Sequence, residues 1–230
     1  MITVAALIAA FNEERHVGDV VAATRPYVSR VFVVDDGSID ETSARARDAG
    51  AVVLRHDDNR GKGSAIRTGL TRILGEPFTH ILFLDADFQH DPAEIPTLIE
   101  RAQRGVGDFV LAERELKREA MPPARFYSNV IGSRILSFLI GVGVTDSQSG
   151  FRLVRADLLR AVQLTGSKYE IETEMLIKLV RRGAVLDRVT VRRLQYEGAR
   201  SKMRPFRDTF RTCMLALGYR YMSGRALDAK

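Results

Sequence analysis

Short apolar runs alternate with helical patterns through the first half of the chain, and this alternation limits the folds open to it. The runs are mostly continuous, which is typical of strands buried on both faces of a parallel sheet. Strands are expected over Thr3–Ala10, Arg30–Asp35, Ala51–Arg55, His80–Asp85 and Asp108–Ala112. Helices are expected over Glu13–Thr24, Glu41–Ala49, Gly63–Leu74 and Pro92–Arg104. The pattern predicts an α/β fold: an open, mostly parallel sheet with helices on both faces.

The second half of the chain is less regular. We expect helices over Pro122–Ile140 and Ile171–Arg182, a strand over Ala184–Arg192, a Gly/Ser-rich turn over Val144–Leu153 and an amphipathic helix over Pro205–Met222. In the first half, Asn12 and Asp91 precede acidic residues at positions typical of helix starts. At 230 residues the chain is predicted to form one domain with a helical tail.

Cysteine usage and the absence of long apolar segments favour a cytoplasmic protein. A single cysteine, Cys213, excludes an internal disulfide and fits a reducing compartment. No signal peptide is recognised, and the apolar run over Ile135–Val144 is far shorter than the roughly 20 residues that span a bilayer. The net charge of +6 favours anionic partners such as phosphates, acidic lipids or nucleic acid, without choosing among them.

The sequence Leu84-Asp85-Ala86-Asp87-Phe88-Gln89 joins a predicted buried strand to a cluster of oxygen ligands. In an extended chain alternate side chains share a face, so Asp85, Asp87 and Gln89 are expected to point the same way. Two carboxylates and an amide suit Mg²⁺ or Mn²⁺, which usually keep positions open for substrate phosphates. An acidic turn that caps the next helix is the alternative, but Asp91 already serves that purpose. We therefore predict a metal–diphosphate site.

A second acidic pair, Asp35-Asp36, lies at the end of the predicted strand Arg30–Asp35, before Gly37. A turn needs only one such residue, so Asp36 is expected to accept hydrogen bonds from a nucleobase or ribose. Asp40 serves equally well as a helix cap. Ligands of open parallel sheets bind beyond the carboxyl ends of the strands, which would place these acids on one rim with Asp85.

Glycine-rich and basic loops supply candidate anion sites. Lys62 precedes a predicted helix start, although Gly61-Lys62-Gly63-Ser64 lacks the upstream glycine of a nucleotide phosphate loop. The dinucleotide-binding glycine pattern also fails, because Asp146 stands at the position of its third glycine. Basic side chains that could hold a second anionic substrate are Arg114, Lys117, Arg125, Arg152 and Lys202.

The order of these motifs resembles the family 2 inverting glycosyltransferases. The matching segments are Phe11-Asn12-Glu13, Val34-Asp35-Asp36-Gly37-Ser38, Asn59-x-Gly61-Lys62-Gly63 and Asp85-x-Asp87-x-Gln89-His90. With Ser149-Gly150-Phe151-Arg152 and Ser201-Lys202 added, the chain is similar to the branch of dolichyl- and polyprenyl-phosphate mannosyl- and glucosyltransferases. Two departures are Ala9, where the family usually has proline, and Ala112-Glu113-Arg114, where it has Gly-Ser-Arg.

The resemblance implies a GT-A-type fold, with a Rossmann-like nucleotide-sugar-binding half over residues 1–112, an acceptor half over 113–204 and a tail over 205–230. Nucleotide-sugar contacts would come from Phe11, Glu13, Asp35, Asp36, Lys62 and Asp85. Asp85, Asp87 and Gln89 would bind Mg²⁺ or Mn²⁺, and Arg114, Arg152 and Lys202 would bind donor or acceptor phosphate. Asp87 and Asp146 are the catalytic candidates, the latter as a base or an orienting carboxylate.

The activity implied is metal-dependent, inverting transfer of mannose or glucose from GDP-mannose or UDP-glucose to a polyprenyl phosphate. An acceptor phosphate is ionised near neutral pH, so it needs little help from a base. The segments Pro122–Val144 and Pro205–Met222 would either lie on the cytoplasmic face of a membrane or pack on the sheet. Alternatively, a separate membrane protein would anchor this chain to the membrane.

Three other functions are weaker. A family 2 transferase acting on a hydroxyl acceptor shares the donor motifs. A nucleotidyltransferase would need a glycine- and arginine-rich phosphate loop near the first strand, and residues 9–14 offer none. A basic nucleic-acid-binding domain leaves the clustered acids unexplained, because they would repel phosphate without a metal. We therefore expect no nucleic-acid partner.

Overall fold

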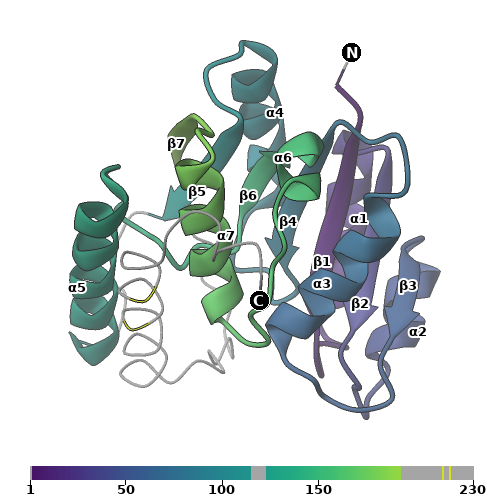
Figure 1. Ribbon diagram of the computed structural model, residues 1–230. Helices are drawn as coiled ribbons and strands as arrows, with labels where there is room; N and C mark the ends of the chain where they lie inside the picture. The colour runs from purple at the N-terminus through teal and green to yellow at the C-terminus, as the bar shows by residue number, and fades with distance from the viewer. Residues whose placement is uncertain (1, 115–122, 193–213, 215–217, 219–230) are drawn as a thin grey trace.

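The computed structural model describes residues 2–114, 123–192, 214 and 218, which form a seven-stranded sheet flanked by helices (Figure 1). The order of the strands across the sheet is β3-β2-β1-β4-β6-β5-β7. The strands are β1 Val4–Ala10, β2 Arg30–Asp35, β3 Val52–Arg55, β4 His80–Asp85, β5 Phe109–Arg114, β6 Arg152–Arg155 and β7 Leu186–Val191. The sheet is mostly parallel, as the apolar runs predict.

The strand β6 is the antiparallel member of the sheet and was not predicted. It lies between β4 and β5, with Leu82 opposite Leu153 on one side and Val110 opposite Leu153 on the other. The expected turn over Val144–Leu153 is wrong at its end, because Arg152 and Leu153 already belong to this strand. Only four residues long and flanked by arginines, β6 carries too little apolar pattern to be recognised.

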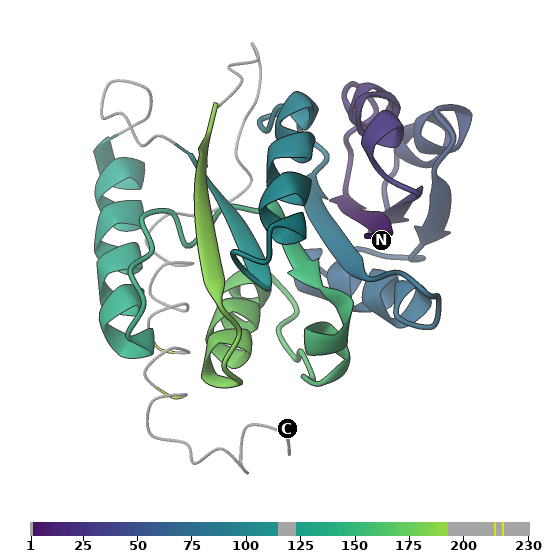
Figure 2. The same ribbon diagram turned by 90° about the horizontal axis from the view of Figure 1, so that it is seen from above.

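Helices cover both faces of the sheet, as predicted. The α-helices are α1 Val17–Thr24, α2 Thr42–Asp48, α3 Lys62–Ile73, α4 Ile95–Gln103, α5 Pro123–Ile140, α6 Ala156–Arg160 and α7 Glu170–Arg181, with short 3₁₀ helices η1 Arg25–Tyr27 and η2 Pro92–Glu94. One apolar cluster packs α1, α2 and α4 on one face, and the other packs α3, α6 and α7 on the opposite face (Figure 2). The two clusters form the hydrophobic core, which fixes the helices to the two faces of the sheet.

Local capping explains where some helices begin. Asp91 accepts a hydrogen bond from the Ala93 amide at 2.9 Å, as expected for the start of η2. The expectation that Asn12 caps a helix is wrong, since α1 begins only at Val17. Asn12 instead adopts a left-handed backbone with φ of 52° and accepts a hydrogen bond from the Ile39 amide. It therefore joins the loops that follow β1 and β2.

The carboxyl ends of β2, β1 and β4 lie side by side. Ala10 of β1 is in register with Asp35, and Ala9 is in register with Asp85. The acidic residues after β2 and β4 therefore reach the same rim of the sheet, as the rule for open parallel sheets predicts.

Several predicted features lie outside the described residues, among them Lys117, Lys202, the helix over Pro205–Met222 and Cys213. Within the described ranges, no helix is both long enough and apolar enough to cross a membrane.

Candidate active site

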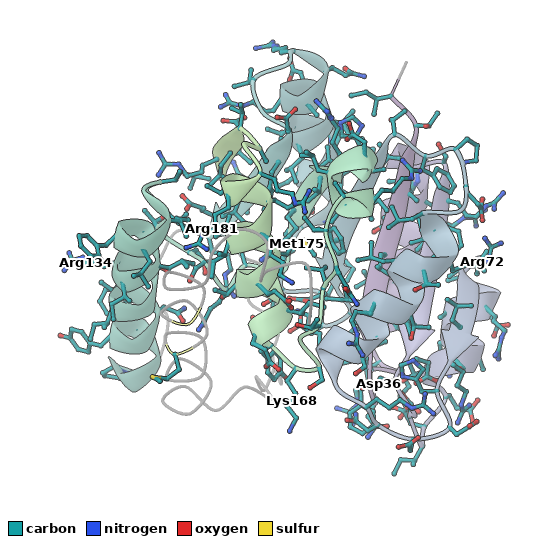
Figure 3. All side chains as sticks on the ribbon, viewed as in Figure 1. Asp36, Arg72, Arg134, Lys168, Met175 and Arg181 are labelled. Atoms are coloured by element: carbon teal, nitrogen blue, oxygen red, sulfur yellow. The ribbon has the colours of Figure 1, made fainter. Side chains whose placement is uncertain are left out.

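A cavity of about 450 Å³ opens beyond the carboxyl ends of β1, β2 and β4. Asp36 and Lys168, both labelled at the lower edge of the view in Figure 3, are part of its lining. Its side chains include Phe11, Glu13, Asp36, Asn59, Lys62, Asp85, Asp87, Gln89, Arg114, Gln148, Lys168, Tyr169 and Glu172. Most of the predicted site residues are thus brought together.

Asp85, Asp87 and Gln89 line the cavity, but not in the extended geometry that was expected. The strand β4 ends at Asp85, and the chain then turns, with Phe88 at a left-handed φ of 58°. The turn is closed by the Gln89 side-chain amide, which donates to Asp87 Oδ2 at 2.5 Å. The assumption of alternating strand positions is wrong, whereas the grouping of the three side chains holds because of the turn.

Lys62, at the start of α3, neutralises two carboxylates of the cavity. Its ammonium nitrogen lies 2.5 Å from Asp85 Oδ1 and 2.6 Å from Glu172 Oε1. Burial opposes ionisation of Asp85, but Lys62 outweighs burial and lowers the pKa of Asp85 to about 2. Burial likewise opposes the charge of Lys62, and the two carboxylates nevertheless raise its pKa above the usual value. The three groups therefore form a charged cluster of one cation and two anions.

Asp87 has less compensation for its charge. Burial, followed by the nearby negative charge of Asp85, raises the pKa of Asp87 to about 6. A divalent cation would offset this unfavourable charge. Among the described residues, no three acidic, histidine or cysteine side chains form a complete metal cage. An incomplete set of oxygen donors suits Mg²⁺ or Mn²⁺, which takes further ligands from substrate phosphates and water.

The two aspartates after β2 differ in placement. Asp35 lies outside the cavity lining, where it accepts hydrogen bonds from the Ser38 amide at 2.9 Å and from the Ser43 hydroxyl. Its carboxylate thus holds the turn after β2, and its placement gives no support to the expected nucleotide contact. Asp36 does line the cavity. Asp40 accepts from the Thr42 amide at 3.0 Å, but the N-cap of α2 is Glu41, so Asp40 lies one residue before the position considered for it.

Arg114 and Asp146 form a buried bidentate ion pair. Arg114 Nε lies 2.6 Å and Nη2 2.9 Å from the two Asp146 oxygens. Burial opposes ionisation of Asp146, yet Arg114 keeps its pKa below the usual value. Arg114 reaches the cavity, whereas Asp146 is fully buried behind it. This geometry suits an orienting carboxylate better than a base.

Arg152 is buried beneath the cavity floor and does not line the cavity. It donates to the backbone oxygens of Glu172, at 2.8 Å, and of Ser149. It therefore ties the start of α7 to the loop before β6, and its placement gives no support to a direct phosphate contact.

The model of a protein family described as "Glycosyl transferase family 2" matches residues 5–163. This chain belongs to glycosyl transferase family 2. It is a glycosyltransferase, as the motif order predicts. The matched segment contains the acidic rim, Lys62 and Arg114, but ends before α7.

Relatives with assigned activities are similar over most of this family 2 chain. An undecaprenyl-phosphate mannosyltransferase of Micrococcus luteus is 30% identical over 186 residues, covering 76% of this chain and 76% of the relative. A UDP-N-acetylglucosamine–dolichyl-phosphate N-acetylglucosaminyltransferase of Methanococcus voltae is 28% identical, covering 92% and 95%.

The fold matches that of a solved glycosyltransferase. Glucosyl-3-phosphoglycerate synthase from Mycobacterium tuberculosis, in complex with Mn²⁺, UDP and glucosyl-3-phosphoglycerate, has a TM-score of 0.74 at 22% identity. The match covers 95% of this chain and 80% of that one. The expected GT-A-type architecture is confirmed.

Residues of this family 2 chain that the motifs did not predict are Glu113 and the cavity wall formed by Lys168, Tyr169 and Glu172. Glu113 accepts hydrogen bonds from the amide and hydroxyl of Thr145, both at 2.7 Å, and so explains the acid found where the family usually has serine. Glu172 looks from its sequence like an ordinary acidic residue in the first turn of a helix. Its contact with Lys62 could not be predicted from the local sequence, because the two residues are 110 positions apart.

Proposed function

We propose that this family 2 glycosyltransferase moves mannose or glucose from a nucleoside-diphosphate sugar to a polyprenyl phosphate, with inversion at the anomeric carbon. The observation that carries the proposal is the cavity in which Asp36, Lys62, Asp85 and Asp87 meet at the rim of the sheet. GDP-mannose and UDP-glucose are the proposed donors.

The cavity provides separate surroundings for the two ends of the donor. Phe11, Glu13 and Asp36 are proposed to bind the nucleoside, since they follow β1 and β2. Lys62 and Asp85 are proposed to hold the diphosphate. A divalent cation, when bound by Asp85, Asp87 and Gln89, would stabilise the negative charge that develops on the leaving diphosphate.

A phosphate acceptor fits the charges on the acceptor side. Asp146 accepts two hydrogen bonds from Arg114, so we propose that it positions Arg114 rather than acting as a base. An acceptor phosphate already carries the charge needed for attack. The guanidinium of Arg114 would draw it to the anomeric carbon. The Micrococcus and Methanococcus relatives are named for transfer to undecaprenyl phosphate and dolichyl phosphate, which supports this acceptor class.

We further propose that residues 1–112 bind the donor and 113–204 the acceptor, with 205–230 as an appended tail. Arg114 and Glu172 reach the cavity from the second of these ranges. Because the acceptor is a lipid, the reaction is placed at the cytoplasmic face of a membrane, with the protein bound peripherally or through a separate membrane partner.

Radiolabelled donors separate the proposed function from its main alternative. Each donor would be incubated with Mn²⁺ and either undecaprenyl phosphate, undecaprenol or a free sugar acceptor. The proposal predicts label in the phosphate lipid alone, and inversion of the anomeric configuration by NMR. Label found only in the hydroxyl acceptors would show that the acceptor assignment is wrong.

A further inference from the structure

His90 is buried beside the cavity without a hydrogen-bond partner. The residue is 2% exposed, and neither Nδ1 nor Nε2 makes a hydrogen bond within the described part of the chain. Its ring packs against Phe151 at a centroid distance of 5.3 Å. Unpaired buried polar groups are rare in native proteins, and each calls for an explanation.

The carboxylate of Asp85 lies close to the His90 ring. His90 Nε2 lies 3.8 Å from Asp85 Oδ2, which is beyond hydrogen-bond range. The other oxygen of Asp85, Oδ1, is 2.5 Å from the Lys62 ammonium. The two oxygens of one carboxylate therefore face two different nitrogen groups, of which only one is engaged.

The backbone behind Asp85 restricts how its carboxylate can move. A Cβ atom added at Gly150 would lie 2.5 Å from Asp85 Oδ2 and 2.6 Å from Oδ1. The carboxylate thus packs directly on the Gly150 backbone, which leaves rotation within its pocket as the available adjustment. A shift of about 1 Å would bring Oδ2 within hydrogen-bond range of His90.

We propose that His90 is a positioning residue for Asp85, donating from Nε2 to Oδ2 when a donor diphosphate and its cation engage the carboxylate. This inference rests on the proposed function. Carboxylates that bind metals are commonly held by a second hydrogen-bond partner, and loss of such a partner typically costs about 10- to 100-fold in metal affinity. The unpaired Nε2 of His90 would then form its hydrogen bond only when the diphosphate and cation are bound.

A purely structural histidine would behave differently on substitution. Because the ring nitrogens are unpaired in the folded protein, replacing His90 by an apolar side chain of similar volume removes a desolvation cost. The variant His90→Leu should therefore keep or increase the free energy of unfolding. The same variant should bind the cation more weakly. Stability and binding are expected to move independently, or in opposite directions.

The test measures Mn²⁺ affinity by isothermal titration calorimetry in the presence of UDP or GDP, together with urea unfolding of the same proteins. We expect His90→Leu and His90→Asn to bind Mn²⁺ about 10- to 100-fold more weakly. His90→Gln should restore most of the affinity, because its amide nitrogen can occupy the place of Nε2, whereas that of asparagine corresponds to Nδ1. His80→Leu is the matched control, since His80 is also buried but lies at the opposite end of β4.

Two results would overturn the inference while the proposed function survives. One is unchanged Mn²⁺ affinity in His90→Leu. The other is a loss of affinity that follows a loss of stability, without rescue by glutamine. If the wild-type protein binds no Mn²⁺ with either nucleotide, the metal-dependent function itself fails, and the role of His90 fails with it.

Discussion

A single ammonium group, that of Lys62, lies between the carboxylates of Asp85 and Glu172 in the cavity at the rim of the sheet. Both carboxylates would lose their directly bonded cation if this group were removed. Breaking a buried ion pair by removing one partner is strongly destabilising, because the remaining charge is left uncompensated. The charge of Lys62 thus contributes to folding as well as to the proposed binding of diphosphate.

The variant Lys62→Met should lower the free energy of unfolding by about 3 kcal/mol, near the lower end of the range for buried pairs because Asp85 is partly exposed. Mn²⁺ should restore part of this loss by replacing the missing positive charge. Urea unfolding with and without Mn²⁺ measures both effects. Lys168→Met, on the same cavity wall, is the control and should change stability little. An unchanged unfolding midpoint in Lys62→Met would contradict the assigned charge balance.

At the residue scale the sequence could predict that Asp36, Asp85 and Asp87 share one cavity, but not the geometry of Asp85 and Asp87. Asp85, Asp87 and Gln89 were grouped on the assumption of an extended strand, yet it is the turn at Phe88 that brings them together. Glu172 could not be predicted, because its partner Lys62 is remote in sequence. Only packing of α7 against α3 places them in contact.

At the scale of elements, Asp36 joins the end of β2 to the loop before α3. Its Oδ1 accepts from His56 Nδ1 at 2.7 Å and from the Arg60 amide at 3.0 Å, and its Oδ2 accepts from the Gly61 amide at 2.7 Å. The same carboxylate that was predicted to bind a nucleoside therefore also shapes the loop that carries Lys62. A contact with the nucleoside would have to use its remaining acceptor capacity.

The variant Asp36→Asn should weaken this loop, because its NH₂ group replaces one of the two accepting oxygens. Either the hydrogen bond from Gly61 or those from His56 and Arg60 would then be lost. We expect a loss of about 1–3 kcal/mol in the free energy of unfolding, and weaker binding of nucleoside diphosphate. Denaturation and calorimetry measure the two effects. Asp58→Asn serves as the control because Asp58 is exposed in the same loop. Equal stability of the two variants would contradict the bridging role of Asp36.

The loop before α7 is held by a second buried carboxylate. Glu174 accepts from the amides of Thr165, at 3.0 Å, and Gly166, at 2.7 Å. Burial opposes its ionisation, but these hydrogen bonds and Lys178 keep the pKa of Glu174 below the usual value. A lowered pKa in the folded state means that the ionised form stabilises the fold, so this contribution is present above the ordinary pKa of the group and is lost as the pH falls through the folded value.

Glu174→Gln should therefore reduce the free energy of unfolding by about 1–3 kcal/mol at pH 7, and the difference from wild type should shrink in acid below about pH 4. Urea unfolding over this pH range measures the difference. Glu170→Gln, at the start of the same helix, provides a comparison for charge loss on α7. A difference that stays constant or grows in acid would exclude the ionised role of Glu174.

Element types were largely predictable, whereas the antiparallel strand and one helix start were not. Continuous apolar runs identified β2 and β4 because burial on both faces demands such runs. The short β6 has no comparable run, and the start of α1 was placed early because Asn12 resembles a cap. Its side chain bonds to Ile39 in another loop instead, a tertiary contact that local sequence does not encode.

At the scale of the whole molecule, β6 joins the two parts of the sheet. By pairing with both β4 and β5, it brings the loop ending at Gly150 against Asp85, and Arg114 at the end of β5 lines the same cavity. Residues from both sequence halves therefore complete one cavity. This arrangement supports the proposal that donor and acceptor bind in the same cavity.

The central claim is that this cavity binds a nucleoside-diphosphate sugar through a cation held by Asp87. The most direct measurement is the melting temperature with GDP-mannose or UDP-glucose, each with and without Mn²⁺, for wild type and Asp87→Asn. We expect a Mn²⁺-dependent rise with one donor in the wild type and loss of that rise in Asp87→Asn, with Asp91→Asn retaining it. No rise with either donor, or the same rise in Asp87→Asn, would contradict the claim.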